Sequence, residues 1–184
     1  MEILFLIIIV LTLIFFIKGI KIVKQQEVIL VERLGIYDRM LCPGLHFIIP
    51  GIENTRGITT RKTKRTIDGR TVSYFVQKET IDLKETFNEF LFQNIVTRYN
   101  ETITIKVLIY FQIIDPKKAV YAIENLPEAI EKLTQIILKE LAEQYWDGTL
   151  VSIEKIKTQL KNRLEESINH WGVKINRIEI QENS

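Results

Sequence analysis

The first two dozen residues constrain the fold and location of this chain more than any other feature. Ile3 to Ile17 is an unbroken apolar run in which Thr12 is the only polar side chain. A helix of that run rises about 22 Å, and continuing it through Val23 reaches about 31 Å, close to the roughly 30 Å hydrocarbon layer of a bilayer. At about −0.4 kcal/mol per residue, the run favours insertion by about 6 kcal/mol. We therefore expect residues 1–23 to form a membrane anchor helix.

The apolar run is also compatible with a cleaved signal peptide or a buried core helix. A signal peptide carries positive charge before its apolar core and small residues at the cleavage site, and neither Met1-Glu2 nor the residues around Lys18-Gly19 fit that pattern. A buried core helix stays possible because the run is short. If the segment does enter a bilayer, composition does not distinguish a single full span from a monotopic segment that enters one leaflet and returns.

Lysines follow the apolar run at intervals of three residues, at Lys18, Lys21 and Lys24. On a continuing helix this spacing places them on one stripe, from which their ammonium groups can reach lipid headgroups. Because positive charge marks the cytoplasmic side of a membrane segment, we expect the soluble domain in the cytoplasm.

A second basic stretch lies between Arg56 and Arg70. It resembles a hairpin, because strand-forming residues flank the turn signal Asp68-Gly69. Its cations are either a solvated hairpin face or further contacts with anionic lipid headgroups. The candidate headgroup contacts in this stretch are Arg61, Lys62, Lys64 and Arg65.

Composition argues against several classes of function. The formal net charge is only +2, from 25 basic and 23 acidic residues, so we expect no nucleic-acid partner. Cys42 is the single cysteine and the two histidines, His46 and His170, are far apart, so neither a disulfide nor a metal site is expected. The eight glycines form no phosphate-binding loop. We expect no cofactor and no catalytic residue.

The rest of the chain has the pattern of an α+β domain. Gln26 to Pro50 is typical of strand, turn and strand, with the turn at Cys42-Pro43-Gly44. Thr102 to Ile113 alternates apolar and polar residues with period two, which predicts a long strand with one buried face. A closing strand is expected from Val173 to Ile180, where the apolar phase switches and predicts a bulge near Asn176-Arg177.

Three helices are expected between the last two strands. Asp115-Pro116 is a typical helix start, with a short helix running to about Glu124, and Asn125-Leu126-Pro127 begins another. Two apolar stripes follow at helical spacing and end at Gly172. They pack on the domain's own sheet or mediate self-association, and they consist of Ile130, Leu133, Ile137, Leu141 and then Ile153, Ile156, Leu160, Leu164, Ile168, Trp171.

Three blocks of residues together resemble one family. Glu32 to Tyr37 followed by Leu41 to Pro50 is similar to the opening signature of stomatin, prohibitin and flotillin proteins, whose shared domain is called SPFH or band 7. Asp115 to Tyr121 resembles the second signature, and Trp171 to Ile180 resembles the closing strand. The resemblance implies an SPFH domain at residues 24–181 behind the anchor, with a tail at 182–184. Most family members continue into a long coiled coil, so a stomatin-like member without that coiled coil is expected.

The resemblance implies a non-enzymatic membrane scaffold. Family members assemble as homo-oligomers or with related SPFH subunits, and they regulate membrane proteases or channels. Our first hypothesis is such a scaffold, with the lipid membrane and further SPFH subunits as partners. The second is a membrane-bound regulatory subunit that binds one partner without self-assembly. A distant third is a hydrolase that uses Cys42, with His46 four residues away.

Overall fold

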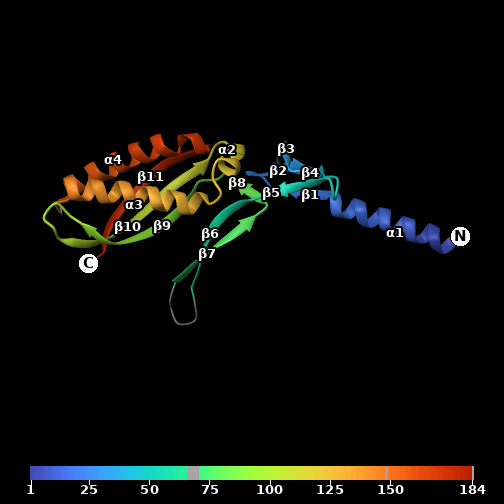
Figure 1. Ribbon diagram of the computed structural model, residues 1–184, viewed down its shortest axis with the longest axis horizontal. Helices are drawn as coiled ribbons and strands as arrows, with labels where there is room; N and C mark the ends of the chain where they lie inside the picture. The colour runs from blue at the N-terminus through green and yellow to red at the C-terminus, as the bar shows by residue number, and fades with distance from the viewer. Residues whose placement is uncertain (66–70, 148, 184) are drawn as a thin grey trace. The chain divides into compact units, whose positions relative to one another are not determined.

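The structure is a computed structural model that describes residues 1–65, 71–147 and 149–183, with the side chains of 63–65, 71–73 and 182–183 outside that description. The chain divides into two compact units (Figure 1). Unit 1 contains Met1–Ile58 and Lys78–Asp82, and unit 2 contains Thr59–Gln77 and Leu83–Ser184. The expected turn at Asp68-Gly69 and the side chains of Lys64 and Arg65 lie outside the described part.

Unit 1 begins with helix α1 (Glu2–Gly19) and continues as strands. The strands are β1 (Ile20–Val23), β2 (Glu27–Arg33), β3 (Ile36–Leu41), β4 (Gly44–Phe47), β5 (Glu53–Arg56) and β8 (Thr80–Asp82). β1 and β4 form a two-stranded antiparallel ribbon, while β2 pairs with β3 along one edge and with β5 and β8 along the other. A small core joins the ribbon and the sheet, and it consists of Val23, Ile29, Val31, Leu41 and Ile48.

Two details of unit 1 differ from the sequence-based expectations. The anchor helix was expected to continue through Val23, but it ends at Gly19, and Ile20–Val23 is strand β1. The three lysines therefore do not share one helical stripe. The segment Gln26 to Pro50 contains three strands rather than two, because β3 lies between the expected pair. Burial alternates along β3, but exposed positions hold apolar Ile36 and Met40 while a half-buried position holds Arg39. The residue types therefore hide the alternation, and the strand is defined by its pairing with β2.

Unit 2 is built around a three-stranded antiparallel sheet in the order β11-β10-β9. Its strands are β9 (Thr86–Val96), β10 (Thr102–Ile113) and β11 (Val173–Asn183). The expected long strand agrees residue for residue with β10, whose alternate side chains Ile105, Val107, Ile109, Phe111 and Ile113 are buried. The predicted bulge is confirmed, because Tyr110 pairs with Arg177 while Phe111 pairs with Ile175, which leaves Asn176 extra.

Helices cover one face of this sheet (Figure 1). α2 (Pro116–Tyr121) begins at the expected cap Asp115 and ends three residues earlier than predicted. α3 (Leu126–Tyr145) packs on β9, and α4 (Leu150–Ile168) packs on α3 and β11 before a 3-10 turn, η1 (Asn169–Trp171). Gly172 then adopts φ +70°, the left-handed conformation expected at that helix end.

The apolar stripes of α3 and α4 form the core of unit 2. Ile130, Leu141, Ile156, Leu160 and Leu164 are fully buried beneath the two helices. Their packing on the domain's own sheet is therefore confirmed, and their alternative role as self-association faces is wrong. Unit 2 also includes most of β6 (Ile58–Arg65) and of its partner β7 (Thr71–Lys78), whose end residues Ile58 and Lys78 belong to unit 1.

Candidate membrane-contact site

The surface of α1 is apolar around its whole circumference. Every residue from Glu2 to Lys18 is exposed, and Gly19 is its only buried residue. A soluble core helix buries at least one face, so the alternative of a buried core helix is wrong. The 18 residues have a mean hydropathy of 2.6, which by length and composition suits a membrane crossing. Glu2 and Lys18 mark the two polar ends of the helix.

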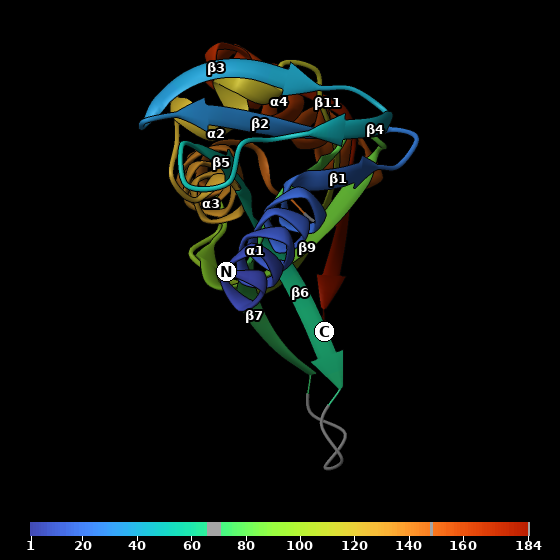
Figure 2. The same ribbon diagram turned by 90° about the vertical axis from the view of Figure 1, so that its right-hand side faces the viewer.

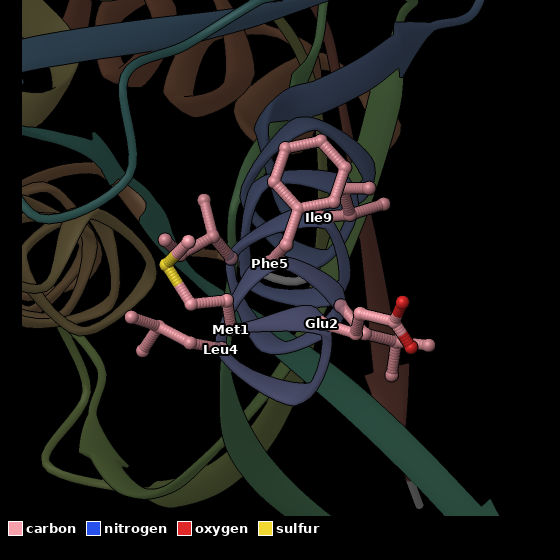
Figure 3. Close-up of a pocket in the computed structure, with 7 residues that line it drawn as sticks. Met1, Glu2, Leu4, Phe5 and Ile9 are labelled. Carbon is pink, nitrogen blue, oxygen red and sulfur yellow. The ribbon is translucent and has the colours of Figure 1, made fainter.

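The start of α1 carries a hollow lined by the side chains of this one helix (Figure 3). Leu4, Phe5 and Ile9 project outward around it, next to Met1 and Glu2. A single helix does not enclose a ligand, and the lining is almost wholly apolar. Such an open, apolar groove suits contact with lipid chains better than it suits an enclosed ligand.

The ribbon of β1 and β4 follows directly on the end of α1 (Figure 2). Its exposed apolar side chains continue the apolar surface of the helix. Ile20 pairs with Phe47 and Ile22 pairs with Leu45, so these four side chains share one face of the ribbon. Ile22 and Leu45 are 74% and 72% exposed, values that are high for apolar side chains in paired strands. The opposite face holds buried Val23, and half-buried Lys21 and His46. We call the set Ile20, Ile22, Leu45 and Phe47 the ribbon face.

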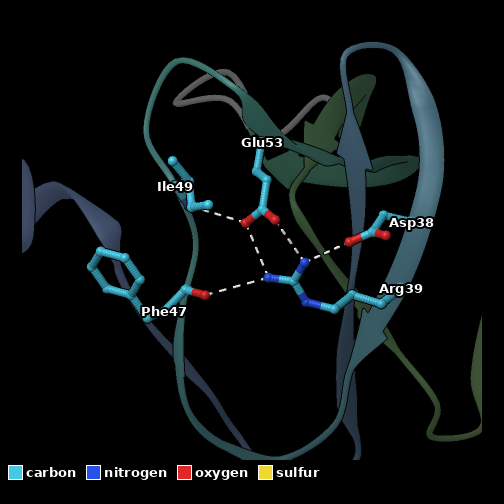
Figure 4. Close-up of polar contacts among 5 residues, drawn as sticks. All are labelled: Asp38, Arg39, Phe47, Ile49 and Glu53. Atoms are coloured by element: carbon cyan, nitrogen blue, oxygen red, sulfur yellow. Dashed lines mark hydrogen bonds and ion pairs between the residues drawn. The ribbon is translucent and has the colours of Figure 1, made fainter.

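A polar cluster holds the loop that follows the ribbon (Figure 4). The guanidinium of Arg39 donates to both carboxylate oxygens of Glu53, at 2.7 and 3.0 Å, and to the carbonyl oxygen of Phe47 at 3.4 Å. The backbone amide of Ile49 donates to Glu53 at 2.9 Å. The bonds from Arg39 and then from Ile49 lower the pKa of Glu53 to about 2, so this buried carboxylate stays charged.

The cations expected to contact headgroups occupy different environments. Lys18 and Lys24 are exposed at either end of β1, and Lys62 is exposed on β6. Lys21 instead forms an ion pair with Glu79 at 2.8 Å. Arg61 pairs with Glu131 at 2.9 Å and lies over the ring of Phe90. A headgroup role stays a prediction for all of them, and internal pairing makes Lys21 and Arg61 the weaker candidates.

The Cys42 and His46 pair shows no nucleophile geometry. The Nε2 atom of His46 donates to the carbonyl oxygen of Cys42 at 2.6 Å, so the bond involves the backbone rather than the thiol. Cys42 is exposed in the turn before β4. Within the described residues, no three His, Cys, Asp or Glu side chains lie close enough together to hold a metal ion.

An α+β domain that follows directly on an exposed apolar helix defines a class of membrane-associated proteins. The chain belongs to the SPFH domain / Band 7 family, whose sequence pattern matches residues 21–183. The resemblance noted in the three sequence blocks is thereby confirmed. Proteins of this family are generally membrane-associated, non-enzymatic scaffolds and are often oligomeric.

Individual relatives agree with this assignment. The chain is 32% identical over 177 residues to an uncharacterized protein of Methanothermobacter thermautotrophicus, an alignment that covers 96% of this chain and 48% of that protein. It is 28% identical to a stomatin homolog of Pyrococcus horikoshii, in an alignment that covers 96% of this chain and 58% of that protein. For the mitochondrial stomatin-like protein 2 of Bos taurus the identity is 29%, with 87% and 39% covered. The chain thus spans about half the length of these relatives.

Proposed function

We propose that the protein is a membrane-anchored scaffold of the stomatin type that self-assembles at the bilayer and organises or regulates membrane proteins such as proteases or channels. The observation that carries the proposal is the continuous apolar surface of α1 and the ribbon face. Alkaline carbonate extraction of native membranes tests it. The full chain is expected in the pellet, and release into the supernatant would contradict the proposal.

The ribbon face extends the membrane contact beyond the helix. α1 alone rises about 27 Å, slightly less than the roughly 30 Å hydrocarbon layer, and the ribbon adds about 13 Å of one-sided apolar surface. Burying four such side chains stabilises the bound state by about 1.5–3 kcal/mol each when burial is complete. We infer that the ribbon lies in the bilayer interface, with Lys18 and Lys24 among the headgroups.

The depth of the ribbon is measurable with a fluorophore. A Leu45→Cys variant in a Cys42→Ser chain carries an environment-sensitive dye on the ribbon face, and Gln159→Cys on the exposed side of α4 is its matched control. Spin-labelled lipids in vesicles are expected to quench the dye at position 45 at least threefold more than the dye at 159. Equal quenching at both positions would remove the ribbon from the membrane-contact site.

Self-association needs a surface other than the buried helix stripes. The outer face of the β9–β10–β11 sheet, opposite the helices, carries Phe87, Tyr110 and Arg177 in one row across all three strands. The rings of Phe87 and Tyr110 lie 5.6 Å apart, and the guanidinium of Arg177 lies 4.1 Å from the Tyr110 ring. Aromatic and arginine side chains of this kind dominate the binding energy of protein interfaces.

The charges beside this row favour association of identical chains. Lys106 pairs with Glu89, and Arg177 with Glu179, so the face is neutral and does not repel a copy of itself. Three rows of outward-facing residues cross the three strands at Lys106, Leu108 and Tyr110. They span about 300 Å² per copy, which is too little for a stable dimer in dilute solution. Confinement to a membrane plane raises the effective concentration, so we expect assembly to depend on the bilayer.

A charge substitution tests the outer sheet face. Phe87→Lys with Leu91→Lys places two cations on exposed positions of β9, and Gln159→Lys with Thr158→Lys does the same on α4. Crosslinking in native membranes is expected to show oligomers for the wild type and the α4 control, and a severalfold loss for the β9 variant. Only monomers in the wild type would contradict self-assembly.

A regulatory subunit that binds a single partner is the second candidate function. Purification in mild detergent separates the candidates, because a fixed stoichiometric partner supports this one and a homo-oligomeric series supports the scaffold. The soluble part is proposed to face the cytoplasm, since positive charge follows the apolar helix. Protease protection in sealed, right-side-out vesicles tests that orientation.

A further inference from the structure

We propose that α1 and the β1–β4 ribbon form one rigid element, so that the tilt of α1 sets the orientation of the soluble part of unit 1. The anchor would then act as a lever rather than as a flexible tether. The inference rests on the proposed membrane role of α1, and three sets of contacts at the helix-to-strand junction support it.

The junction is closed around Gly19. The helix passes into β1 within one residue, since Ile20 already has an extended conformation. The carbonyl oxygen of Gly19 accepts a hydrogen bond from the amide of Ile48 at 2.8 Å. A Cβ atom at position 19 would lie 2.3 Å from the ring of Phe47 and 2.6 Å from the carbonyl oxygen of Ile48. Only glycine permits this approach of the helix end to the last residue of β4 and the loop residue after it.

The ring of Phe47 links the two sides of the junction. It lies 5.8 Å from the ring of Phe16 in the last turns of α1, a distance typical of an aromatic pair. Phe47 is also the cross-strand partner of Ile20, the first residue of β1. One side chain therefore packs against the helix and the strand that leaves it, which restricts bending between them.

The ribbon is in turn fixed to the sheet of unit 1. The carbonyl oxygen of Phe47 accepts from Arg39, which is held by Glu53. Lys21 pairs with Glu79, and Val23 is buried in the small core. Because each end of β1 is held by contacts with other elements, rotation of α1 carries the ribbon and the sheet with it. A flexible linker would instead sample a wide range of angles.

Pulsed electron paramagnetic resonance tests the rigid element in the full chain. Nitroxides at Leu13→Cys in α1 and Arg56→Cys in β5, in a Cys42→Ser background, occupy exposed positions of unit 1. Samples in nanodiscs and in detergent micelles are diluted with unlabelled chain, which removes distances between copies. We expect one narrow distance distribution in both environments. Insertion of Gly-Ser-Gly-Ser after Gly19 is expected to broaden it at least twofold.

Point variants assign the rigidity to the junction. Gly19→Val and Phe47→Ala are each expected to broaden or shift the distribution, while Ile17→Ala, at an exposed position in the same turn, leaves it unchanged. Circular dichroism confirms that each variant is folded. A wild-type distribution as broad as that of the insertion variant would overturn the proposal. That result is distinguishable from failure of the membrane role, which carbonate extraction reports separately and which does not affect the micelle measurement.

Discussion

Arg39 and Glu53 come from different strands, β3 and β5, and meet in a two-point ion pair with N–O distances of 2.7 and 3.0 Å. The pair lies beside β2, which separates the two strands in the sheet. The Glu53 side chain is 3% exposed whereas the Arg39 side chain is 40% exposed, so only the arginine of the pair contacts solvent. It holds the loop after β4 in place and thereby the end of the ribbon.

Replacing Glu53 is expected to destabilise unit 1. Glu53→Gln leaves the amide of Ile49 and the guanidinium of Arg39 with a neutral partner. We expect a loss of about 1.5–3 kcal/mol in the free energy of unfolding, since hydrogen bonds to charged groups contribute about that much. Asp38→Asn is the control, because Asp38 contacts the same guanidinium from a more exposed position. Its expected loss is below about 0.5 kcal/mol. Urea unfolding in detergent followed by circular dichroism measures both, and equal losses would contradict a special role for Glu53.

The same carboxylate predicts a pH dependence of stability. The folded pKa of Glu53, about 2, lies below its unfolded value of 4.5. The stability it contributes is therefore fully present above the unfolded pKa and is lost as the pH falls through the folded pKa. The hydroxyls of Ser152 and Thr149 also lower the pKa of Asp147 to about 2, which adds to the same loss.

Comparison of the wild type with Glu53→Gln separates the contributions of Glu53 and Asp147 to the pH dependence of stability. Asp147 is present in both proteins, so only the contribution of Glu53 differs between them. Urea unfolding at pH 6, 4 and 3 is expected to show a steeper loss of stability for the wild type. Parallel curves would mean that Glu53 has its ordinary pKa in the folded state.

Truncation of the α4 core tests whether the stripe is packed. Leu160 is fully buried, and Leu160→Ala is expected to cost about 2–5 kcal/mol in the free energy of unfolding through lost contacts and a residual cavity. Gln159→Ala changes the exposed neighbour on the same helix, with an expected effect within about 0.5 kcal/mol. Thermal unfolding of the two variants in detergent provides the comparison. A mild effect of Leu160→Ala would indicate a loosely packed helix.

Two glycines with positive φ offer a matched pair of substitutions. Gly172 and Gly35 have φ of +70° and +83°, so alanine is strained at both. A Cβ at Gly172 would also lie 2.6 Å from the carbonyl oxygen of Asp115, whereas nothing lies within 4 Å at Gly35. We expect Gly35→Ala to lower the free energy of unfolding by about 1 kcal/mol. Gly172→Ala is expected to lower it clearly more, because a backbone clash adds to the conformational cost. Chemical denaturation of both variants decides the order, and a reversed order would contradict the close approach at Gly172.

Local patterns in the sequence determined several elements correctly. The period-two alternation from Thr102 to Ile113 defined β10, because each side chain reports its own face of a strand. The caps Asp115 and Asn125 marked the starts of α2 and α3, since each side chain accepts a bond from an amide three residues on. The phase switch in the closing strand located the bulge at Asn176. The apolar character of α1 was equally evident, because a long run of apolar residues needs no partner to be recognised.

Strand β9 shows where local patterns fail. Phe90, Phe92 and Ile95 are buried, but Phe87 and Leu91 point to the exposed face, so apolar residues on both faces hide the alternation. Asn94, at φ +58°, further shifts the register beside Ile103 and Ile105. The strand is recognisable only through its pairing with β10.

What the sequence determined by itself is the presence of an apolar anchor, the α+β class and the family of the domain, because each depends on residues close together in the chain. Only the tertiary structure decided where the anchor ends and what surrounds it. Gly19 stops α1 because it packs beneath Phe47, 28 positions away, and the ribbon face exists only when β1 pairs with β4. Such contacts are set by geometry across the fold, where the spacing of residues along the chain carries no information about which side chains meet.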